Sequence, residues 1–406
     1  MENTLSDLRK GETPWTKDGF SCTVHPEKII GSLTTDILII GAGITGAFLA
    51  EIFSRTDKKV VVVDRHHPQT ASTMASTSLL QWEIDAPLVE LADYIGLEKA
   101  LKVYRQSFAS VDYISQLVAK LGIACDFAPR KTLYLEGNKL NSTQLHDEFK
   151  LREQASFPCQ WLDKKAVAEN YGFDGRAAIH SAANAEADPV LLARGLLNTA
   201  TQRGALVLSP ANAGSFDFEN HKVHIRIEET GLEIIADTLI LASGYEMPPF
   251  VKTAQHEIVS TWAICTVPQM SQAPWHEKDL VWESADPYFY MRTTTKNEII
   301  IGGEDEEISD ADKRDVLLPE KTLALQNKLQ ELLPHADTTA QYAWCAFFGT
   351  TEDSLPLIGN VPDYSNVYAA YGYGGNGITF SALAAQLLSG QILAGKKIDP
   401  AYMLER

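Results

Sequence analysis

Residues 36–46 read DILIIGAGITG, and residues 60–64 read VVVVD. The apolar run after Asp36 predicts a buried strand, the glycines predict a tight turn, and the apolar-faced run ITGAFLAEIFSRT predicts a helix. The second apolar run predicts another buried strand, which ends at Asp64. This stretch therefore predicts a β-α-β unit with a glycine turn between its first strand and its helix.

The glycine turn has the spacing GxGxxG, formed by Gly41, Gly43 and Gly46. The first glycine permits the tight turn, the second lets a diphosphate approach the backbone, and the third lets the helix pack close to the strand. The helix N-terminus attracts the diphosphate, and Asp64 is placed to accept hydrogen bonds from the adenosine ribose. The motif predicts an adenine dinucleotide without separating NAD from FAD.

The order of the later elements favours FAD. A compact NAD domain continues β-α-β-α-β at once, whereas the return strands here, 205–209, 221–228 and 237–244, follow residue 204. The pattern closes only at the C-terminus with a strand (366–370), a second glycine turn, YGYGGNG, and a helix. Between these segments, helical periodicity covers about 87–122, and the pair Asp188 and Pro189 opens a further helix. Alternation from Ile258 to Gly303 predicts a second, mostly antiparallel sheet, and a helix follows at 318–334.

Composition sets limits on the function. The 406 residues are 45% hydrophobic and carry a formal net charge of −18, which disfavours nucleic acid and anionic lipid as partners. The first residues contain no apolar signal region, and no apolar run is long enough for a bilayer, so we expect a cytoplasmic protein with no membrane span. The five cysteines lie far apart without paired metal-ligand spacing, so no metal site is expected.

Four stretches, taken in order, resemble one known family: 36–46 with 60–64; TASTMASTSLL at 70–80; DTLILASG at 237–244; and TTEDSLPLIGNVP at 350–362 followed by YGYGGNGITFSA. The chain is similar here to the FAD-dependent oxidoreductases that include D-amino-acid oxidase, glycine oxidase and sarcosine oxidase. The resemblance runs from about residue 36 to 393. It implies a two-domain, glutathione-reductase-like FAD-binding Rossmann-type α/β fold with a mixed, mostly antiparallel substrate-domain sheet.

The expected domains are discontinuous. The FAD-binding domain comprises 34–88, 163–250 and 345–406, and the substrate domain comprises 89–162 and 251–344. We expect residues 1–33 to form an N-terminal arm laid on the surface.

The resemblance also implies FAD contacts, residue by residue. The diphosphate contacts are Gly41, Gly43, Ile44, Thr45 and Gly46, and the ribose contacts are Asp64 and Arg65. The loop along the diphosphate and ribityl chain contributes Ser72, Thr73, Met74 and Ala75, with Leu79 near the ring. The adenine is met by Ala213, Ser243 and Gly244, and the pyrimidine edge of the flavin by Gly374, Gly375, Asn376, Gly377, Ile378 and Thr379. Cys345 falls one position away from the cysteine that binds the ring covalently in sarcosine oxidase-like relatives, so FAD is expected to be noncovalent.

The substrate side departs from its relatives. The arginine that anchors a substrate carboxylate in glycine oxidase-like sequences corresponds to Phe348, and the run STSLLQWE has none of the basic residues of sarcosine oxidase-like sequences. A carboxylate buried without a cationic partner is unstable. The substrate is therefore expected to be a small amine or an amino-acid-like molecule rather than a simple α-amino acid.

Four residues are candidates for the catalytic face. Tyr290 matches the tyrosine that relatives aim at the substrate, and Arg292, on the same strand face, either replaces the missing clamp or pairs with a carboxylate for structural reasons. The aromatic candidates to line the pocket are Trp82, Trp262, Trp282 and Trp344, of which we expect only Trp344 to do so. Phe348 completes the set, and Glu83 either binds a cationic amine or is solvated.

The predicted reaction is hydride transfer from the carbon next to an amine nitrogen to flavin N5. One alternative is a flavin dehydrogenase acting on a hydroxy acid, and another is a protein with structural FAD that binds a partner. A plain NAD dehydrogenase is disfavoured by the C-terminal glycine turn. The lysine that helps oxygen to react in sarcosine oxidase-like sequences falls near Ile300, so the electron acceptor, oxygen or another, stays open.

Overall fold

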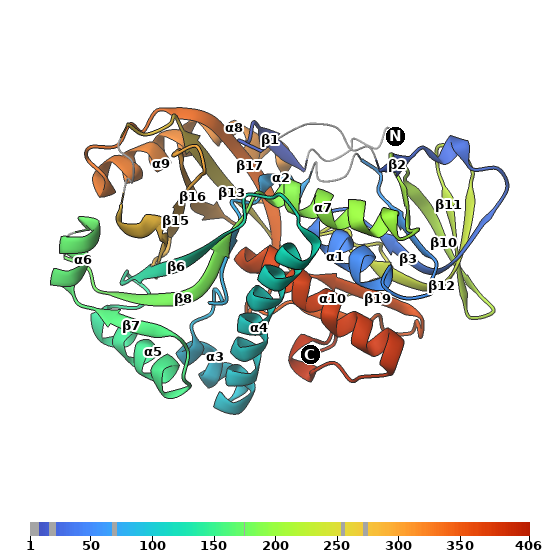
Figure 1. Ribbon diagram of the computed structural model, residues 1–406, viewed down its shortest axis with the longest axis horizontal. Coiled ribbons are helices and arrows are strands. Elements are labelled where there is room, and N and C mark those ends of the chain that lie inside the picture. The colour runs from blue at the N-terminus through green and yellow to red at the C-terminus, as the bar shows by residue number, and fades with distance from the viewer. Residues whose placement is uncertain (1–7, 16–21, 67–70, 174, 253–255, 271–274) are drawn as a thin grey trace.

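A computed structural model describes the chain except for residues 1–7, 16–21, 67–70, 174, 253–255 and 271–274. The described residues form two β-sheets, each with its own helices (Figure 1). The predicted two-domain α/β fold, with one Rossmann-type sheet and a second sheet that is mixed and mostly antiparallel, is confirmed.

The first sheet has nine strands and contains the predicted β-α-β unit. Its order is β10-β11-β12-β3-β4-β9-β2, and β19 pairs with both β12 and β18. Neighbours from β12 through β3, β4 and β9 to β2 are parallel. Its strands are β2 (Thr23–Val24), β3 (Leu33–Ile40), β4 (Val60–Val63), β9 (Leu206–Leu208), β10 (Ala213–Glu219), β11 (Lys222–Ile227), β12 (Glu233–Leu241), β18 (Leu357–Asn360) and β19 (Val367–Tyr371).

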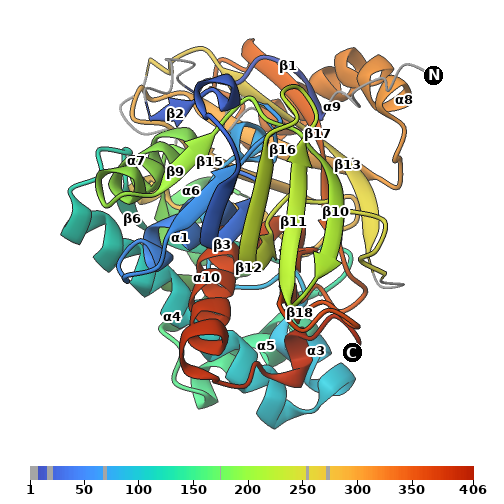
Figure 2. The same ribbon diagram turned by 90° about the vertical axis from the view of Figure 1, so that its right-hand side faces the viewer.

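Apolar helices pack against the first sheet (Figure 2). Helix α1 (Ile44–Phe53) contacts both α7 (Pro189–Gln202) and α10 (Gly377–Ala394). The predicted start of α7 is confirmed, because the Asp188 side chain accepts hydrogen bonds from the backbone N–H groups of the first turn and Pro189 opens the helix. The expectation that no apolar run is long enough for a bilayer is wrong for Gly374–Ala394, which is long and apolar enough to cross a membrane. Of its apolar window, 56% is buried inside the fold, as in the core helix of a globular domain.

The second sheet has ten strands in the order β1-β17-β13-β16-β15-β14-β6-β8-β5, with β7 paired to β8. Its pairs are antiparallel apart from β14 with β6. Its strands are β1 (Arg9–Gly11), β5 (Leu79–Leu80), β6 (Ala128–Leu135), β7 (Cys159–Leu162), β8 (Ala178–Glu186), β13 (Glu257–Thr266), β14 (Leu280–Glu283), β15 (Phe289–Thr293), β16 (Ile299–Glu306) and β17 (Ala340–Thr350).

Most of the remaining helices belong to segments inserted around these strands. They are α2 (Ser72–Ala75), α3 (Leu88–Ile95), α4 (Leu97–Leu121), α5 (Ser142–Gln154), α6 (Lys164–Tyr171), α8 (Ala311–Val316) and α9 (Leu318–Leu332), with short 3-10 turns at Pro26–Lys28, His276–Lys278, Gly374–Asn376 and Pro400–Tyr402. The predicted helical region 87–122 is two helices, because Gly96 at φ 89° ends the first. The predicted helix at 318–334 is confirmed as α9.

Sheet membership shifts the expected domain boundaries. Strand β8 lies in the second sheet although 163–250 was assigned to the FAD-binding domain, and β17 continues to Thr350 although that assignment resumed at 345. β8 and β17 belong to the second sheet because they pair with distant strands, and the local sequence pattern does not predict such pairing. We propose that the division into domains follows the two sheets, with β8 and all of β17 in the substrate domain.

The N-terminal arm is not laid on the surface as expected. Strand β1 pairs with β17 at the edge of the second sheet, and the Trp15 side chain is buried. Residues 1–7 and 16–21 of the arm lie outside the described residues. The described part of the arm therefore contributes an edge strand to each sheet, β1 to the second and β2 to the first.

Candidate functional site

A cavity of about 710 Å³ lies where the two sheets meet. Its walls come from segments far apart in the sequence: the first glycine turn, the end of β4, the loop at 71–79, the start of β10, the segment after β12, strands β14, β15 and β17, and the second glycine turn. The described chain thus brings both glycine motifs to one continuous space.

The first glycine turn has the geometry that its spacing predicts. Gly41 has a φ of 106°, and a side chain there would overlap the carbonyl oxygen of Ala242. A side chain at Gly46 would overlap the carbonyl oxygen of Gly41, so the close packing of helix on strand requires glycine. A Cβ at Gly43 would lie 3.1 Å from Thr73 Oγ1, on the wall of the cavity. At each of the three positions, a different steric contact therefore favours glycine.

Asp64 is held at the cavity wall by the backbone. Its Oδ2 accepts a hydrogen bond from Ala42 N at 2.6 Å, and its Oδ1 accepts one from His66 N at 2.9 Å. Burial raises the pKa of Asp64, and these N–H groups act in the opposite direction. Arg65, beside it, forms an ion pair with Glu246, and both residues line the cavity. The carboxylate is thus fixed where a ribose hydroxyl can reach it.

Most of the predicted cofactor residues line this cavity. They are Gly41, Gly43, Ile44, Thr45, Asp64, Arg65, Ser72, Thr73, Ala75, Leu79, Ala213, Ser243, Gly244, Gly374, Gly375, Asn376, Gly377 and Ile378. Three predicted residues do not line it. Gly46 packs beneath the turn, Met74 is buried in a cluster with Trp15, and Thr379 donates its hydroxyl to the carbonyl oxygen of Gln81.

An aromatic wall at the adenosine end was not predicted. Phe216 and Phe250 line the cavity near Ala213, and their ring centroids are 5.4 Å apart. Phe216 follows the strand start that the sequence assigned to the adenine, whereas Phe250 comes from the segment after β12. Flat aromatic faces suit the faces of an adenine ring.

The second glycine turn is tied to the segment 81–85. Gly375 N donates to Asp85 Oδ2 at 2.7 Å, and Asn376 Nδ2 donates to the carbonyl oxygen of Glu83 at 2.8 Å. Asp85 lines the cavity and was missed, because its neighbours in sequence carry no motif and its partner lies at the other end of the chain. A carboxylate therefore stands beside the turn at the start of α10.

FAD fits this arrangement. The cavity joins a helix N-terminus at Gly43, which would stabilise a diphosphate, to a second helix start at Gly377, which would stabilise the pyrimidine edge of a flavin. Ser78 Oγ, on the loop between them, is buried without a hydrogen-bond partner in the described structure. The residues present can thus hold both halves of the cofactor.

The remaining wall is aromatic and hydroxylic. It contains Thr261, Trp282, Tyr288, Tyr290, Phe347 and Phe348, so two of the four predicted catalytic residues line the cavity. The Tyr288 hydroxyl donates to Asp305 Oδ2 at 2.7 Å, and burial raises the pKa of Asp305 to about 6. Burial, reinforced by the negative charges of Asp305 and Asp85, raises the pKa of both tyrosines.

The other two predicted catalytic residues do not line the cavity. Trp344 is buried, and its Nε1 donates to the carbonyl oxygen of Ala75 at 2.8 Å. Arg292 is buried and pairs with Glu186 at 3.3 Å, so the structural alternative for this arginine is the correct one. Burial lowers the pKa of Arg292, although Glu186 acts in the opposite direction. Trp282, rather than Trp344, is the tryptophan of the cavity wall.

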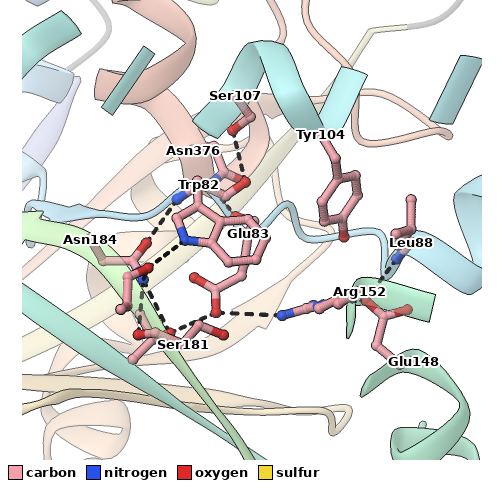
Figure 3. A network of polar contacts seen from close by, with 12 residues as sticks. Trp82, Glu83, Leu88, Tyr104, Ser107, Glu148, Arg152, Ser181, Asn184 and Asn376 are labelled. Atoms are coloured by element: carbon pink, nitrogen blue, oxygen red, sulfur yellow. Dashed lines mark hydrogen bonds and ion pairs between the residues drawn. The ribbon is translucent and has the colours of Figure 1, made fainter. Parts of the chain in front are cut away.

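Glu83 is also unavailable to a substrate. Figure 3 shows its carboxylate beside Arg152, which lies between Glu83 at 3.4 Å and Glu148 at 2.6 Å. All three side chains are fully buried, and Glu148 accepts the backbone N–H of Leu88 at the start of α3. This ion-pair network supports the segment 81–88 from behind, because a buried charge that loses its partner is strongly destabilising.

The described residues contain no group of three or more side chains placed to hold a metal ion. All five cysteines are free.

Comparisons with known proteins agree with this geometry. Residues 36–391 match the model of a family described as FAD dependent oxidoreductase. The uncharacterized oxidoreductase YurR of Bacillus subtilis is 26% identical over 371 residues, which cover 89% of this chain and 95% of YurR.

Solved structures share the fold. The glycine oxidase from Geobacillus kaustophilus superimposes with a TM-score of 0.74 at 18% identity, covering 92% of this chain and 99% of its own. The iminodiacetate oxidase from Chelativorans sp. BNC1 gives a TM-score of 0.71 at 20% identity, covering 91% and 99%. The match spans both glycine turns and nearly all of the cavity wall. The chain is therefore a member of the family of FAD-dependent oxidoreductases that contains D-amino-acid oxidase.

Proposed function

We propose that the protein oxidises a C–N bond of a small amine or amino-acid-like molecule by hydride transfer to flavin N5. The observation that carries the proposal is the charge of the cavity wall. Among its described lining residues the basic side chains are Arg65 and His66, both next to Asp64 at the adenosine end. The wall near Tyr290 and Phe348 has no cation for a carboxylate, whereas Asp85 offers a carboxylate to an ammonium group.

When bound, FAD supplies the electron sink, and the carbon next to the substrate nitrogen gives up the hydride. The chain contributes orientation and electrostatics. Because the Tyr288 hydroxyl donates its hydrogen to Asp305, its oxygen can accept an N–H of the substrate. Asp85 attracts a protonated amine, and the cavity walls raise its pKa, so it is suited to accept the proton that the amine must lose. The aromatic walls exclude water from the reacting carbon.

The names of the neighbours support nitrogen chemistry. The solved structures that share the fold include a glycine oxidase, an iminodiacetate oxidase and an L-proline dehydrogenase. A hydroxy-acid dehydrogenase is less suited to this cavity, because a phosphate or carboxylate there would lack an arginine or lysine partner. The position expected for an oxygen-activating lysine is Ile300, which is fully buried, so the proposal does not fix the electron acceptor.

Anaerobic mixing of the purified protein with separate panels of amines, amino acids and hydroxy acids tests the proposal. Flavin absorbance should bleach with one or more amines or amino-acid-like compounds, since hydride transfer reduces the ring. Bleaching by hydroxy acids alone would contradict the proposed chemistry. Absence of bleaching with every compound would favour structural FAD. Admitting oxygen or a quinone afterwards identifies the acceptor from the rate at which the colour returns.

Asp85→Asn should lower kcat/KM for an amine by on the order of tenfold to a hundredfold, because a hydrogen bond to a charged group contributes about 1.5–3 kcal/mol. Asparagine keeps the size of the side chain and an oxygen for Gly375 N, so the FAD dissociation constant should stay unchanged. Asp147→Asn, which removes the same charge from the exposed face of α5, is the matched control. Equal kcat/KM in both variants would exclude Asp85 from amine binding.

FAD should leave the protein on heating or acid treatment. Cys345, the candidate for covalent attachment, is buried, donates its Sγ–H to Asp315 Oδ1 at 3.5 Å, and is not among the residues that line the cavity. Burial raises the pKa of this thiol to about 11, so it is protonated and a poor nucleophile at neutral pH. Flavin absorbance of the supernatant after precipitation measures the release. Yellow colour that stays with the pellet would contradict noncovalent binding.

A further inference from the structure

Three consecutive carbonyl groups of the cavity loop are each bound by a buried side chain from a different part of the chain. Trp344 Nε1 donates to the carbonyl oxygen of Ala75 at 2.8 Å, and Trp15 Nε1 donates to that of Ser76 at 3.0 Å. Arg292 Nε donates to the carbonyl oxygen of Thr77 at 2.6 Å. We call these three donors, Trp15, Arg292 and Trp344, the carbonyl clamp. They come from the N-terminal arm, from β15 and from β17.

The donors of the clamp also support one another. The Arg292 guanidinium lies 5.3 Å from the Trp15 ring centroid and donates a further hydrogen bond to the carbonyl oxygen of Ala187 at 3.1 Å. Trp15 and Trp344 share one buried apolar cluster with Met74, the residue whose predicted place at the cavity wall proved wrong. A side chain packed in this way has a fixed direction, so its N–H points at one carbonyl.

The arm that carries Trp15 is itself anchored. Strand β1 pairs Gly11 with Trp344, and Glu12 N donates to the carbonyl oxygen of Ala343 at 3.0 Å. A side chain at Gly11 would overlap that same carbonyl oxygen, so glycine is required for the close approach. Leu8 lines the cavity, and its carbonyl oxygen accepts from the Tyr245 hydroxyl at 3.4 Å. The family match begins at residue 36, so the arm lies outside the residues that the family model covers.

The loop needs such external contacts. Ser78 has a φ of 59°, a left-handed conformation that costs on the order of 1 kcal/mol or more for a residue with a side chain. On its cavity side the loop presents Ala75, Ser76, Thr77 and Ser78. Because the outward carbonyls are bound by the clamp, the opposite side of the loop has one defined shape toward the cavity.

We propose that Trp15, Arg292 and Trp344 are positioning residues for FAD, and that the N-terminal arm is thereby part of the cofactor site. The clamp fixes the loop 75–78, which would lie along the cofactor, but its three side chains do not line the cavity and so would not contact the cofactor. This inference is independent of the substrate, since it concerns only the binding of FAD.

Trp15→Phe tests it, because phenylalanine keeps a buried aromatic ring and removes the N–H donor. It also removes part of the indole ring system, and the control variant Trp275→Phe makes the same truncation elsewhere. The FAD dissociation constant, measured by titrating apoprotein with FAD and following flavin fluorescence, should rise about fivefold, the loss of one hydrogen bond of about 1 kcal/mol. Trp344→Phe should give a similar rise, since it removes the donor to the preceding carbonyl, that of Ala75. Far-ultraviolet circular dichroism of each apoprotein checks that the chain is folded during the titration.

Trp275→Phe is the matched control. Trp275 is equally buried, its Nε1 donates to the carbonyl oxygen of Asp279 at 2.7 Å, and it is not among the residues that line the cavity. This variant should lose a comparable amount of thermal stability and keep the wild-type affinity for FAD. FAD affinities of folded Trp15→Phe and Trp344→Phe that equal that of Trp275→Phe would overturn the proposal, because the clamp would then serve stability alone.

Discussion

Gly43→Glu is expected to yield a colourless protein that binds no FAD. The backbone of Gly43 lines the cavity at the N-terminus of α1, and even a Cβ there would lie 3.1 Å from Thr73 Oγ1. A glutamate side chain would extend into the diphosphate position and bring a second negative charge to it. Steric overlap and charge repulsion act together, so we expect loss of all measurable affinity rather than a graded decrease.

The same variant should unfold at a lower temperature than the wild-type holoprotein. A ligand present at a hundred times its dissociation constant contributes about 2.7 kcal/mol to the free energy of unfolding, and the variant forgoes this contribution. Absorbance of the purified protein and thermal unfolding with and without added FAD measure both effects. Thr143→Glu, which adds the same charge at an exposed position of α5, is the control and should stay yellow. A yellow Gly43→Glu protein of normal stability would show that the turn is not the cofactor site.

Individual strands, turns and helix starts of this fold could be predicted, because the sequence pattern of each lies within a short segment. The first glycine turn, the strand that ends at Asp64 and the capped start of α7 at Asp188 are confirmed, since strand, turn and cap preferences depend on neighbouring residues. The second glycine turn was recognised in the same way from the run YGYGGNG.

The remainder depended on contacts between distant segments, which one sequence does not report. Strand β8 belongs to the second sheet because it pairs with β6, and β1 of the N-terminal arm belongs there because it pairs with β17. Arg292 shares a strand face with Tyr290, yet its side chain turns to Glu186 and to the loop carbonyl of Thr77. The alternation of side chains along β15 predicts the face of the sheet on which Arg292 lies, but it does not predict which residues Arg292 contacts.

Asp85 illustrates the same limit at the candidate substrate site. The run STSLLQWE at 76–83 contains no basic residue, and no motif marks Asp85, two positions beyond its end. Its importance follows from the hydrogen bond that it accepts from Gly375 N, which joins the segment between β5 and α3 to the turn before α10. Asp85 and Phe348, which stands where relatives have an arginine, line the same cavity. In the sequence they are more than two hundred residues apart, so nothing connects them there.

Phe348→Arg is expected to create activity on glycine, sarcosine or another small amino acid and to weaken turnover of amines. Phe348 is half-buried in β17 and lines the cavity, at the position where glycine oxidase-like sequences have an arginine. A guanidinium there would pair with a substrate carboxylate through two hydrogen bonds and would repel an ammonium group. Because charged hydrogen bonds contribute about 1.5–3 kcal/mol each, kcat/KM for a small amino acid should rise by at least about tenfold.

Tyr290→Phe is the companion variant, because it changes the same cavity wall by removing a hydroxyl group without adding a charge. The Tyr290 hydroxyl lies in the same cavity, and its removal should lower turnover of the native substrate about fivefold while FAD stays bound, since one neutral hydrogen bond contributes about 1 kcal/mol. It should leave the preference between amines and amino acids unchanged, because no charge is altered. Steady-state kinetics of both variants on one amine panel and one amino-acid panel distinguish the two effects. If native turnover is unchanged in both variants, the substrate binds elsewhere and the aromatic wall of Tyr290 and Phe348 is not the substrate face.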